Sequence, residues 1–285
     1  MLDEKLASMD KRFDSVDKTL QELLSSTLTP RSADLVDACA RKSVFLVTFS
    51  SSNGGDLNEN GSNLIRHCSA FSYKPFPSRD AVIVTASHCF FPVFNKTSFL
   101  NKTPFVVFLS ILDQHVRHEC SVLDFRGSPD DATILSCPTL INIPGLLSSN
   151  DTRLSQLVAI TGFAADTYNT STTFVNSHHI HNDNTDSPSF ALNVDFSRIV
   201  SIAGPPHKLQ DGSVCVSSAD EMTWPVHPSG FVDRRVTQGL SGGPILDLTC
   251  GVIGIAHGRS CNAGVFMNLL GVDEYILTME KTNTI

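Results

Sequence analysis

The sequence predicts an all-β protein of the barrel or sandwich type, and three observations support that class. Short apolar runs rich in β-branched residues recur along most of the chain. Segments rich in Gly, Asn, Ser and Pro separate these runs, as turns separate the strands of such folds. A hydrophobic fraction of 41% and a charged fraction of 18% over 285 residues are typical of a globular protein with a substantial core.

The first element in the chain is predicted to be a helix over residues 1–30. Apolar residues recur there at alternating spacings of four and three, at Leu2, Leu6, Met9, Phe13, Val16, Leu20 and Leu23. Mostly charged and polar residues lie between them, which is the pattern of a heptad coiled coil. Homo-oligomerisation through this helix, a lone amphipathic helix packed on the domain, and a disordered leader remain the three interpretations. Pro30 is expected to end the helix and begin a short linker.

From about Ala33 onward the pattern is β. Strands are expected within the apolar runs 43–50, 81–87, 104–112, 132–135, 157–163, 190–204, 243–258 and 264–270. Residues 164–189 are polar and are expected to form a long loop between two halves of the fold. Helical spacing in VDEYILTMEK predicts a short C-terminal helix that closes the domain.

Composition argues against several classes of partner and site. A net charge of −8 disfavours nucleic acid or an anionic membrane as the main partner. No apolar run reaches the roughly 18 residues of a membrane-spanning helix. The eight cysteines form no C-x-x-C pair, so no structural zinc site is expected. The charged start of the chain lacks the apolar segment of a signal peptide, which favours an intracellular protein, although disulfides and Asn-x-Ser/Thr sequons would be compatible with secretion.

Three stretches together carry the chemistry of a nucleophilic enzyme. VIVTASHCF puts His88 at the end of an apolar strand, SPDDATIL puts two acids before another strand, and QGLSGGPIL puts Ser241 in a glycine turn. A serine hydroxyl becomes a nucleophile when an imidazole takes its proton and a carboxylate orients the imidazole. Gly239 can adopt backbone angles that aim N–H groups into one small space, where the Ser241 N–H would join it to stabilise an oxyanion. A buried histidine or a turn serine alone would have a structural explanation, but the ordered set favours catalysis.

The order His, Asp, Ser and the contexts TASHC, DATIL and GLSGGP resemble the chymotrypsin/trypsin-like serine protease superfamily. HCSAFSY before VTASHC resembles the cysteine pair that flanks the catalytic histidine in that family, here Cys68 and Cys89. GVIGIAHG followed by CNAGVFMNLL resembles the segment that forms a substrate-binding wall. The resemblance covers about residues 40–280 and implies a 31–285 protease domain of two antiparallel β-barrels, at about 36–145 and 155–275.

The resemblance implies a serine endopeptidase that acts on a protein or peptide substrate and needs no metal or organic cofactor. Ser241 is expected to be the nucleophile, His88 the acid–base and Asp131 the residue that orients His88. Asp130 remains the alternative acid. Asp131 is favoured because the family's aspartate precedes a four-residue apolar run with a small residue second, and because choosing Asp130 would bury Asp131 where an apolar side chain belongs.

Other polar residues are assigned by their place in the sequence. Arg235 lies six residues before Ser241, where trypsin-like enzymes carry the residue at the base of the primary pocket, so it argues against cleavage after Lys or Arg. His257 is expected to line the substrate pocket or to touch the catalytic aspartate. The polar loop carries His178, His179 and His181, where a solvated surface cluster is favoured over a zinc or copper site.

Leu240 occupies the position before the nucleophile, where trypsin-like zymogens carry an aspartate that pairs with a newly released N-terminal ammonium. Because leucine cannot make that ion pair, we predict an enzyme competent as synthesised, or one controlled by assembly through its N-terminal helix. The alternative from another class is a protease-fold scaffold that no longer cleaves. VDACARKSVFLVTF also resembles the first strand of high-temperature-requirement proteases, a resemblance confined to the protease module.

Overall fold

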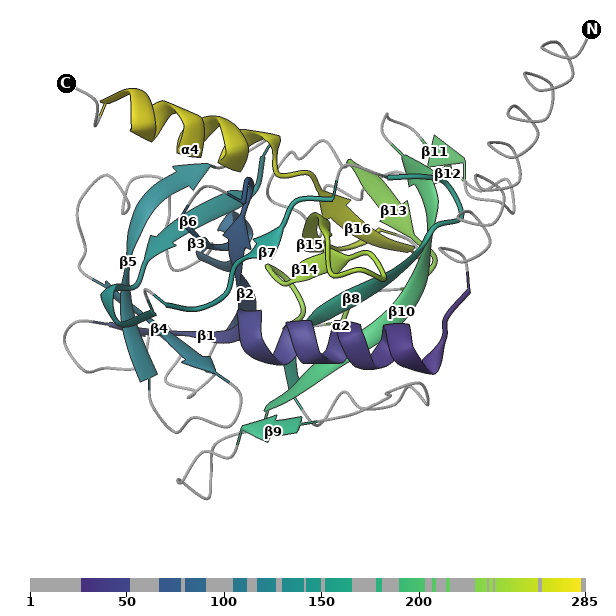
Figure 1. Cartoon of the computed structure of the whole chain (residues 1–285), viewed down its shortest axis with the longest axis horizontal. Coiled ribbons are helices and arrows are strands. Elements are labelled where there is room, and N and C mark those ends of the chain that lie inside the picture. The colour runs from purple at the N-terminus through teal and green to yellow at the C-terminus, as the bar shows by residue number, and fades with distance from the viewer. Residues whose placement is uncertain are drawn as a thin grey trace, which may run out of the picture.

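The computed structural model describes residues 27–51, 67–77, 80–90, 105–111, 117–126, 130–140, 142–149, 152–165, 178–180, 190–202, 207–208, 214–215, 229–234, 236–237, 239–260 and 263–282. Their strands form two seven-stranded sheets and one small two-stranded sheet. Each large sheet curls into a ring, and the two rings lie next to each other (Figure 1).

The first ring is a closed antiparallel barrel. Its strands, in spatial order, are β1 (Val44–Ser51), β4 (Phe105–Ile111), β5 (Arg117–Arg126), β6 (Ala132–Ser136), β3 (Val82–Ala86) and β2 (His67–Lys74), and pairing of β1 with β2 closes the ring. The seventh strand, β7 (Leu146–Leu147), runs parallel to β2. A short 3-10 turn, η2 (Pro138–Leu140), follows β6.

The second ring has short strands along one side. Its spatial order is β13 (Gly230–Val232), β16 (Ala263–Met267), β15 (Val252–Ser260), β14 (Pro244–Leu246), β8 (Leu157–Ala165) and β10 (Phe190–Ile202). Pairing of β10 with β13 links the two ends of this series. Because β13 and β14 have three residues each, this ring is held mainly by the long pairing of β8 with β10. The small sheet consists of β11 (His207–Lys208) and β12 (Val214–Cys215).

Most of the expected strands are confirmed. The apolar runs that begin at 43, 81, 104, 132, 157, 190 and 264 correspond to β1, β3, β4, β6, β8, β10 and β16, and the run 243–258 holds both β14 and β15 with a turn between them. Strands β2 and β5 were not predicted. β2 has the sequence HCSAFSYK, whose small and polar residues give no apolar run, although both of its faces are buried between Cys68 and Tyr73.

The expectation of one long loop over 164–189 is wrong in two places. Strand β8 continues through Ala165, and residues His178–Ile180 form β9, which pairs with the start of β10. Neighbouring strands can recruit a polar segment into a sheet through main-chain hydrogen bonds alone. The remainder of 164–189 lies outside the described residues.

The chain enters the first barrel through a helix rather than through the predicted linker and strand. α2 (Pro30–Ser43) begins at Pro30, the residue expected to end a helix, because proline at the first helical position loses no hydrogen bond there. The Thr29 hydroxyl accepts from the Ser32 N–H at 3.2 Å and the Ser32 hydroxyl accepts from the Thr29 N–H at 3.0 Å, which caps the helix. One face buries Ala33, Val36, Asp37, Ala40 and Ser43.

The predicted N-terminal helix of residues 1–30 has its heptad positions at residues 2–23, which lie outside the described residues, as does any assembly through them. Residues 27–29 are described and are not helical. The C-terminal helix is confirmed as α4 (Leu270–Thr282). It packs on the first barrel, where the Tyr73 hydroxyl of β2 donates to Asp273 Oδ1 at 2.8 Å. Neither described helix is long and apolar enough to cross a membrane.

Three disulfides join six of the described cysteines. Cys68 pairs with Cys89, as the resemblance implied, and Cys120 pairs with Cys137 within the first barrel. Cys39 of α2 pairs with Cys250 in the turn between β14 and β15, and this bond connects α2 to the second barrel. Disulfide bonds are typical of proteins in oxidising compartments, so these three bonds do not favour the intracellular location expected from the sequence.

Candidate active site

Two of the three predicted catalytic residues stand at neighbouring strand ends of the first barrel. His88 lies in the 3-10 turn η1 (Ser87–Phe90), directly after β3, and Asp131 directly precedes β6. Strands β3 and β6 are paired so that Ala86 faces Ala132. This antiparallel register places Ser87, which follows β3, next to Asp131, which precedes β6, and His88 is one residue further along.

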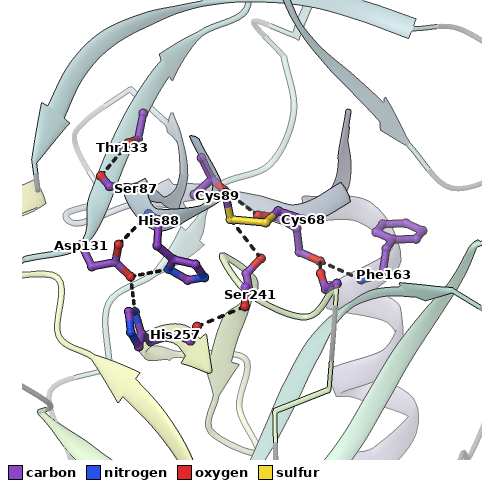
Figure 2. The surroundings of a disulfide bond; sticks show 12 residues. Cys68, Ser87, His88, Cys89, Asp131, Thr133, Phe163, Ser241 and His257 are labelled. Atoms are coloured by element: carbon purple, nitrogen blue, oxygen red, sulfur yellow. Dashed lines mark hydrogen bonds and ion pairs between the residues drawn. A yellow bond between two sulfur atoms is a disulfide. The ribbon is translucent and has the colours of Figure 1, made fainter. Parts of the chain in front are cut away.

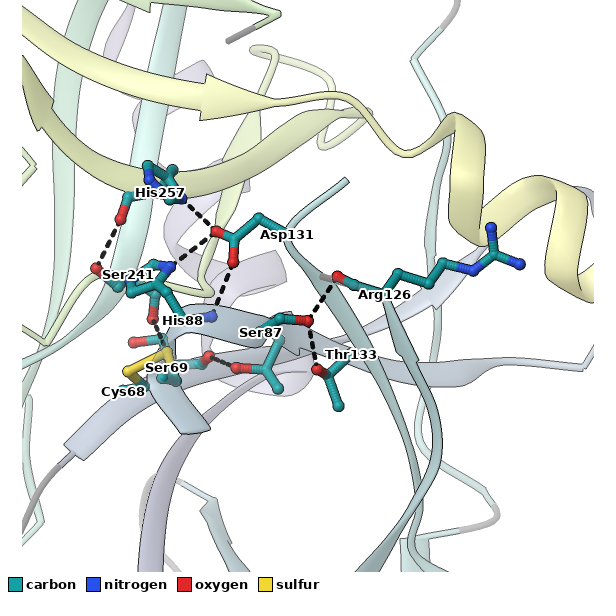
Figure 3. A network of polar contacts seen from close by, with 11 residues as sticks. Cys68, Ser69, Ser87, His88, Arg126, Asp131, Thr133, Ser241 and His257 are labelled. Atoms are coloured by element: carbon teal, nitrogen blue, oxygen red, sulfur yellow. Dashed lines mark hydrogen bonds and ion pairs between the residues drawn. A yellow bond between two sulfur atoms is a disulfide. The ribbon is translucent and has the colours of Figure 1, made fainter. Parts of the chain in front are cut away.

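Ser87 fastens the histidine segment to the aspartate segment. Its N–H donates to the Asp131 carbonyl at 3.1 Å and its hydroxyl donates to the Arg126 carbonyl at 2.8 Å, while Thr133 Oγ1 lies 2.7 Å from the same hydroxyl (Figure 3). Ser87 is fully buried, so these bonds have no competition from water. The sequence analysis did not identify Ser87, although it stands directly before the candidate histidine in TASHC.

Asp131 receives three N–H groups on its carboxylate. The backbone N–H of His88 donates to Oδ1 at 2.8 Å, and Nδ1 of His88 donates to Oδ2 at 2.7 Å. Nδ1 of His257 also bonds to Oδ2. The carboxylate itself is fully buried. Asp131 has a φ of +48°, a left-handed conformation that Asp tolerates better than most residues and that is common at functional sites.

These contacts keep Asp131 ionised. Burial acts to raise the pKa of Asp131, but the charge of His88 and the hydrogen bonds from His257 and His88 outweigh it, and the pKa lies well below its ordinary value. An ionised carboxylate only accepts hydrogen bonds, so Nδ1 must be the protonated nitrogen of His88. Nε2 of a neutral His88 is then left as an acceptor, the state that a general base requires.

His257 lies on β15 in the second barrel and is only 4% exposed. Of the two positions expected for it, pocket wall or contact with the aspartate, its side chain takes the second, against Asp131. Its ring centroid lies 4.5 Å from that of His88 in an edge-to-face arrangement. Two imidazoles from different barrels therefore meet on one carboxylate.

Ser241 approaches from the second barrel, in the turn that precedes β14. The ring of His88 lies between Asp131 and Ser241 (Figures 2 and 3). The hydroxyl of Ser241 donates to the carbonyl of His257 at 3.1 Å, so it is directed past the histidine ring rather than onto Nε2. The structure thus brings the nucleophile candidate next to His88 with its hydroxyl turned aside.

The glycine turn around Ser241 requires its glycines. Gly239 has a φ of +97°, and a Cβ there would lie 2.4 Å from the Phe163 carbonyl oxygen. Between Gly239 and Ser241, Leu240 is 2% exposed and packs in the apolar core of the second barrel with Val158 and Ile160. An aspartate at Leu240 would be a buried charge among apolar groups, so leucine suits this turn.

Asp130, the alternative acid, does not contact the candidate catalytic histidine. The side chain of Asp130 is 36% exposed, and its carboxylate lies 3.7 Å from Arg126 Nη1 rather than at His88. Arg235 lies outside the described residues, as do the side chains of His178, His179 and His181. The role predicted for Arg235 and the surface interpretation of the three histidines therefore stay predictions.

His88, Asp131 and His257 also form a set with metal-ligand chemistry. In the observed arrangement each imidazole uses its Nδ1 proton to bond to Asp131. A protonated Nδ1 has no lone pair for a metal, so a metal bound by both Nδ1 atoms together with Asp131 would replace these hydrogen bonds. The geometry fits the hydrogen-bonded form.

Of the comparisons with known proteins, the one with solved structures supports the fold. No protein-family model and no curated protein sequence matches the chain. Among solved structures, the active form of the Rv3671c protease from M. tuberculosis aligns with a TM-score of 0.51 and 18% identity, over 85% of this chain and 82% of that one. The structure of Deg5 aligns with a TM-score of 0.50 and 14% identity, over 87% of this chain and 94% of that one. The chain therefore has the double-barrel fold of the trypsin-like serine proteases.

Proposed function

We propose that the chain is a serine endopeptidase that hydrolyses peptide bonds through an acyl-enzyme. The observation that carries the proposal is the buried, ionised Asp131 bonded to His88, whose ring lies between that carboxylate and Ser241. An isolated buried carboxylate is unfavourable. Here its charge is matched to an imidazole that faces a serine in a glycine turn, which is the arrangement that activates a serine nucleophile.

The chemistry follows from these three side chains. Nε2 of His88 takes the proton of the Ser241 hydroxyl as Oγ bonds to the carbonyl carbon of the substrate. The C–N bond breaks when His88 returns that proton to the departing amine, which leaves an ester on Ser241. Water then loses a proton to His88 and attacks the ester carbon. The ester C–O bond breaks as His88 returns that proton to Ser241 Oγ, which releases the acid and restores the hydroxyl.

Before the first step, the Ser241 hydroxyl has to turn away from the His257 carbonyl. This turn exchanges one hydrogen bond for another. A neutral hydrogen bond contributes about 1 kcal/mol net, so this exchange is small beside the barrier to peptide hydrolysis. Catalytic hydrogen bonds commonly tighten only once substrate is bound.

The oxyanion of each tetrahedral intermediate would lie against the N–H groups of Gly239 and Ser241. Among the described residues neither N–H donates to another protein group, whereas the Leu240 N–H between them bonds to the Thr237 carbonyl at 3.1 Å. Donors already oriented toward a developing charge stabilise the transition state more than they stabilise the substrate.

We assign His257 to the positioning of Asp131 rather than to substrate contact. Its side chain is almost completely buried and bonds to the carboxylate on the face away from solvent. This second imidazole helps to keep Asp131 ionised and oriented toward His88.

The proposed enzyme is competent without proteolytic activation. In zymogens of the resembled family an aspartate before the nucleophile pairs with a new N-terminus, and here Leu240 is buried in the core instead. No ammonium is needed to hold this turn, so the peptidase would be active as synthesised or would be controlled by assembly.

A fluorophosphonate probe tests the proposal because it reacts with an activated serine and not with an ordinary one. We expect the probe to label the folded wild-type protein at one residue, Ser241, as read by intact mass and peptide mapping. Ser241→Ala should abolish labelling, and His88→Ala should slow it by roughly a hundredfold or more, because the serine loses its base.

The main alternative, a silent scaffold of protease fold, predicts a different result. If the folded wild-type protein stays unlabelled while a control protease reacts, the chain is not a serine hydrolase and the scaffold interpretation holds. Circular dichroism of all three proteins verifies that they are folded.

A further inference from the structure

Ser69 is a fully buried serine that connects the two barrels at the glycine turn. It lies on β2 of the first barrel, next to the disulfide-bonded Cys68. Its N–H donates to the Ser241 carbonyl at 2.8 Å, and its hydroxyl donates to the Gly239 carbonyl at 2.8 Å. Figure 3 shows Ser69 on the first-barrel side of Ser241.

The direction of the hydroxyl bond is fixed, because the Gly239 carbonyl oxygen can only accept. The N–H of Phe163, on β8, donates to the Ser69 hydroxyl at 2.7 Å. A hydroxyl has a single proton, and an N–H can only donate, so the Ser69 proton is directed to the Gly239 carbonyl. With its own carbonyl accepting from Thr85 at 2.7 Å, Ser69 has every polar group in use.

The two carbonyls that Ser69 holds belong to Gly239 and Ser241, whose N–H groups are the proposed oxyanion donors. Two further bonds hold the peptide units between them: the Leu240 N–H to the Thr237 carbonyl at 3.1 Å, and the Gly243 N–H to the Leu240 carbonyl at 2.9 Å. With the carbonyls turned toward Ser69 and Gly243, rotation of these peptide units would break buried hydrogen bonds. The turn is thereby held in one conformation.

The surroundings of Ser69 leave little space. A Cβ on Gly162 would lie 2.5 Å from the Ser69 hydroxyl oxygen, and a Cβ on Gly242 would lie 2.2 Å from the Ser69 carbonyl oxygen. Glycine at these two positions lets β8 and the turn approach Ser69 closely. The hydroxyl therefore fits a site formed by three separate segments.

We propose that Ser69 is a positioning residue of the active site, whose hydroxyl holds the oxyanion turn in its working conformation in place of an ion pair at Leu240. This inference rests on the proposed function and adds to it the residue that takes over the task of the zymogen aspartate. Ser69 itself contacts no reacting atom.

The test compares two single substitutions in one strand. Ser69→Ala removes the hydroxyl that bonds to Gly239. Ser72→Ala is the matched control, because Ser72 is also a buried serine of β2, and among the described residues its hydroxyl has no hydrogen-bond partner. Both variants are assayed with a peptide substrate and by hydrogen exchange of the segment 239–243.

We expect Ser69→Ala to lower kcat by about 10- to 100-fold with little change in KM, because oxyanion donors act in the transition state. Exchange at the amides of Leu240, Gly242 and Gly243 should quicken in this variant. Ser72→Ala should stay within about twofold of wild type in both measurements.

Unchanged kcat and unchanged exchange in folded Ser69→Ala would refute the inference, and so would equal losses in the two alanine variants. If the wild-type protein itself neither cleaves peptides nor reacts with a fluorophosphonate, the proposed function fails. The exchange comparison then still decides whether the Ser69 hydroxyl holds the turn.

Discussion

Asp131 combines a charge, complete burial and a left-handed backbone in one residue. None of the three is favourable alone. The imidazoles of His88 and His257 compensate the charge, and the backbone N–H groups of His88 and Ser87 bond to the buried oxygens. A residue maintained under such constraints is expected at a functional site.

Substitution of the two adjacent acids separates their roles. Asp131→Asn should lower kcat by roughly 10⁴-fold, because an amide N–H facing His88 favours the tautomer whose Nε2 is protonated and is no longer a base. Asp130→Asn is the matched control and should change kcat less than about twofold, since it removes only a half-exposed ion pair with Arg126. Steady-state peptide hydrolysis measures both, with thermal unfolding to verify folding. Comparable losses in the two variants would contradict the assignment of Asp131.

The reach of sequence reasoning at this scale depends on whether a residue acts through a local pattern. His88 and Ser241 have distinctive neighbours in the chain, so both could be singled out, and the apolar run after Asp131 favoured it over Asp130. Ser69 and Ser87 have no such pattern, because their partners are 170 and 39 residues away in the chain. His257 and Asp131 are 126 residues apart in the chain. The sequence therefore predicted their contact only as one of two options, the other being a place in the wall of the substrate pocket.

At the scale of elements, α2 is where the prediction from sequence fails most clearly. Pro30 suggested the end of a helix, but the same residue type begins one when a capping residue precedes it, as Thr29 does. The following residues, including Val36 and Ala40, are apolar at helical spacing, and they bury one face against both barrels. Short-range capping chemistry outweighed the β-like composition of the segment.

The cap of α2 gives a test at this scale. Thr29→Ala removes the side-chain acceptor for the Ser32 N–H and should lower the free energy of unfolding by about 1 kcal/mol. Thr29→Ser keeps the hydroxyl and should remain within about 0.3 kcal/mol of wild type. Urea unfolding followed by circular dichroism measures the difference. Equal stability of all three proteins would show that the capping bonds contribute nothing.

Strands divide into two groups by the same logic. Those buried through long apolar or β-branched residues, such as β1 and β8, were predictable from composition. β2 and β5 were not, because β2 mixes small and polar residues with two aromatic ones and β5 mixes polar with apolar side chains. In both, main-chain pairing within a closed ring places the strand, and a closed ring is a property of the whole barrel rather than of one segment.

At the scale of the whole molecule, the Cys39–Cys250 disulfide closes a loop of 211 residues, whereas Cys120–Cys137 closes one of 17. The chain-entropy argument predicts more stabilisation from the longer loop. The paired substitution Cys39→Ala with Cys250→Ala should therefore lower the free energy of unfolding by about 2–5 kcal/mol.

The second cysteine pair serves as the control for the first. Cys120→Ala with Cys137→Ala should cost less, in denaturant unfolding measured without reducing agent. If the short-loop variant loses as much stability as the long-loop variant, local packing rather than chain constraint determines the contribution of these disulfides.

The first and last described helices each contact the barrel that lies farther away along the chain. α2 precedes the first barrel in the chain but contacts β8 and β10 of the second barrel and is bonded to Cys250, while α4 follows the second barrel but packs on β6 and on Tyr73 of the first (Figure 1). During synthesis, the strands of the first barrel are made before α4, and α2 is made before the strands β8 and β10 that it contacts. The first barrel lacks the helix α4 until the second half has been made, and α2 lacks its contacts with the second barrel. We therefore expect the two halves to complete their packing together.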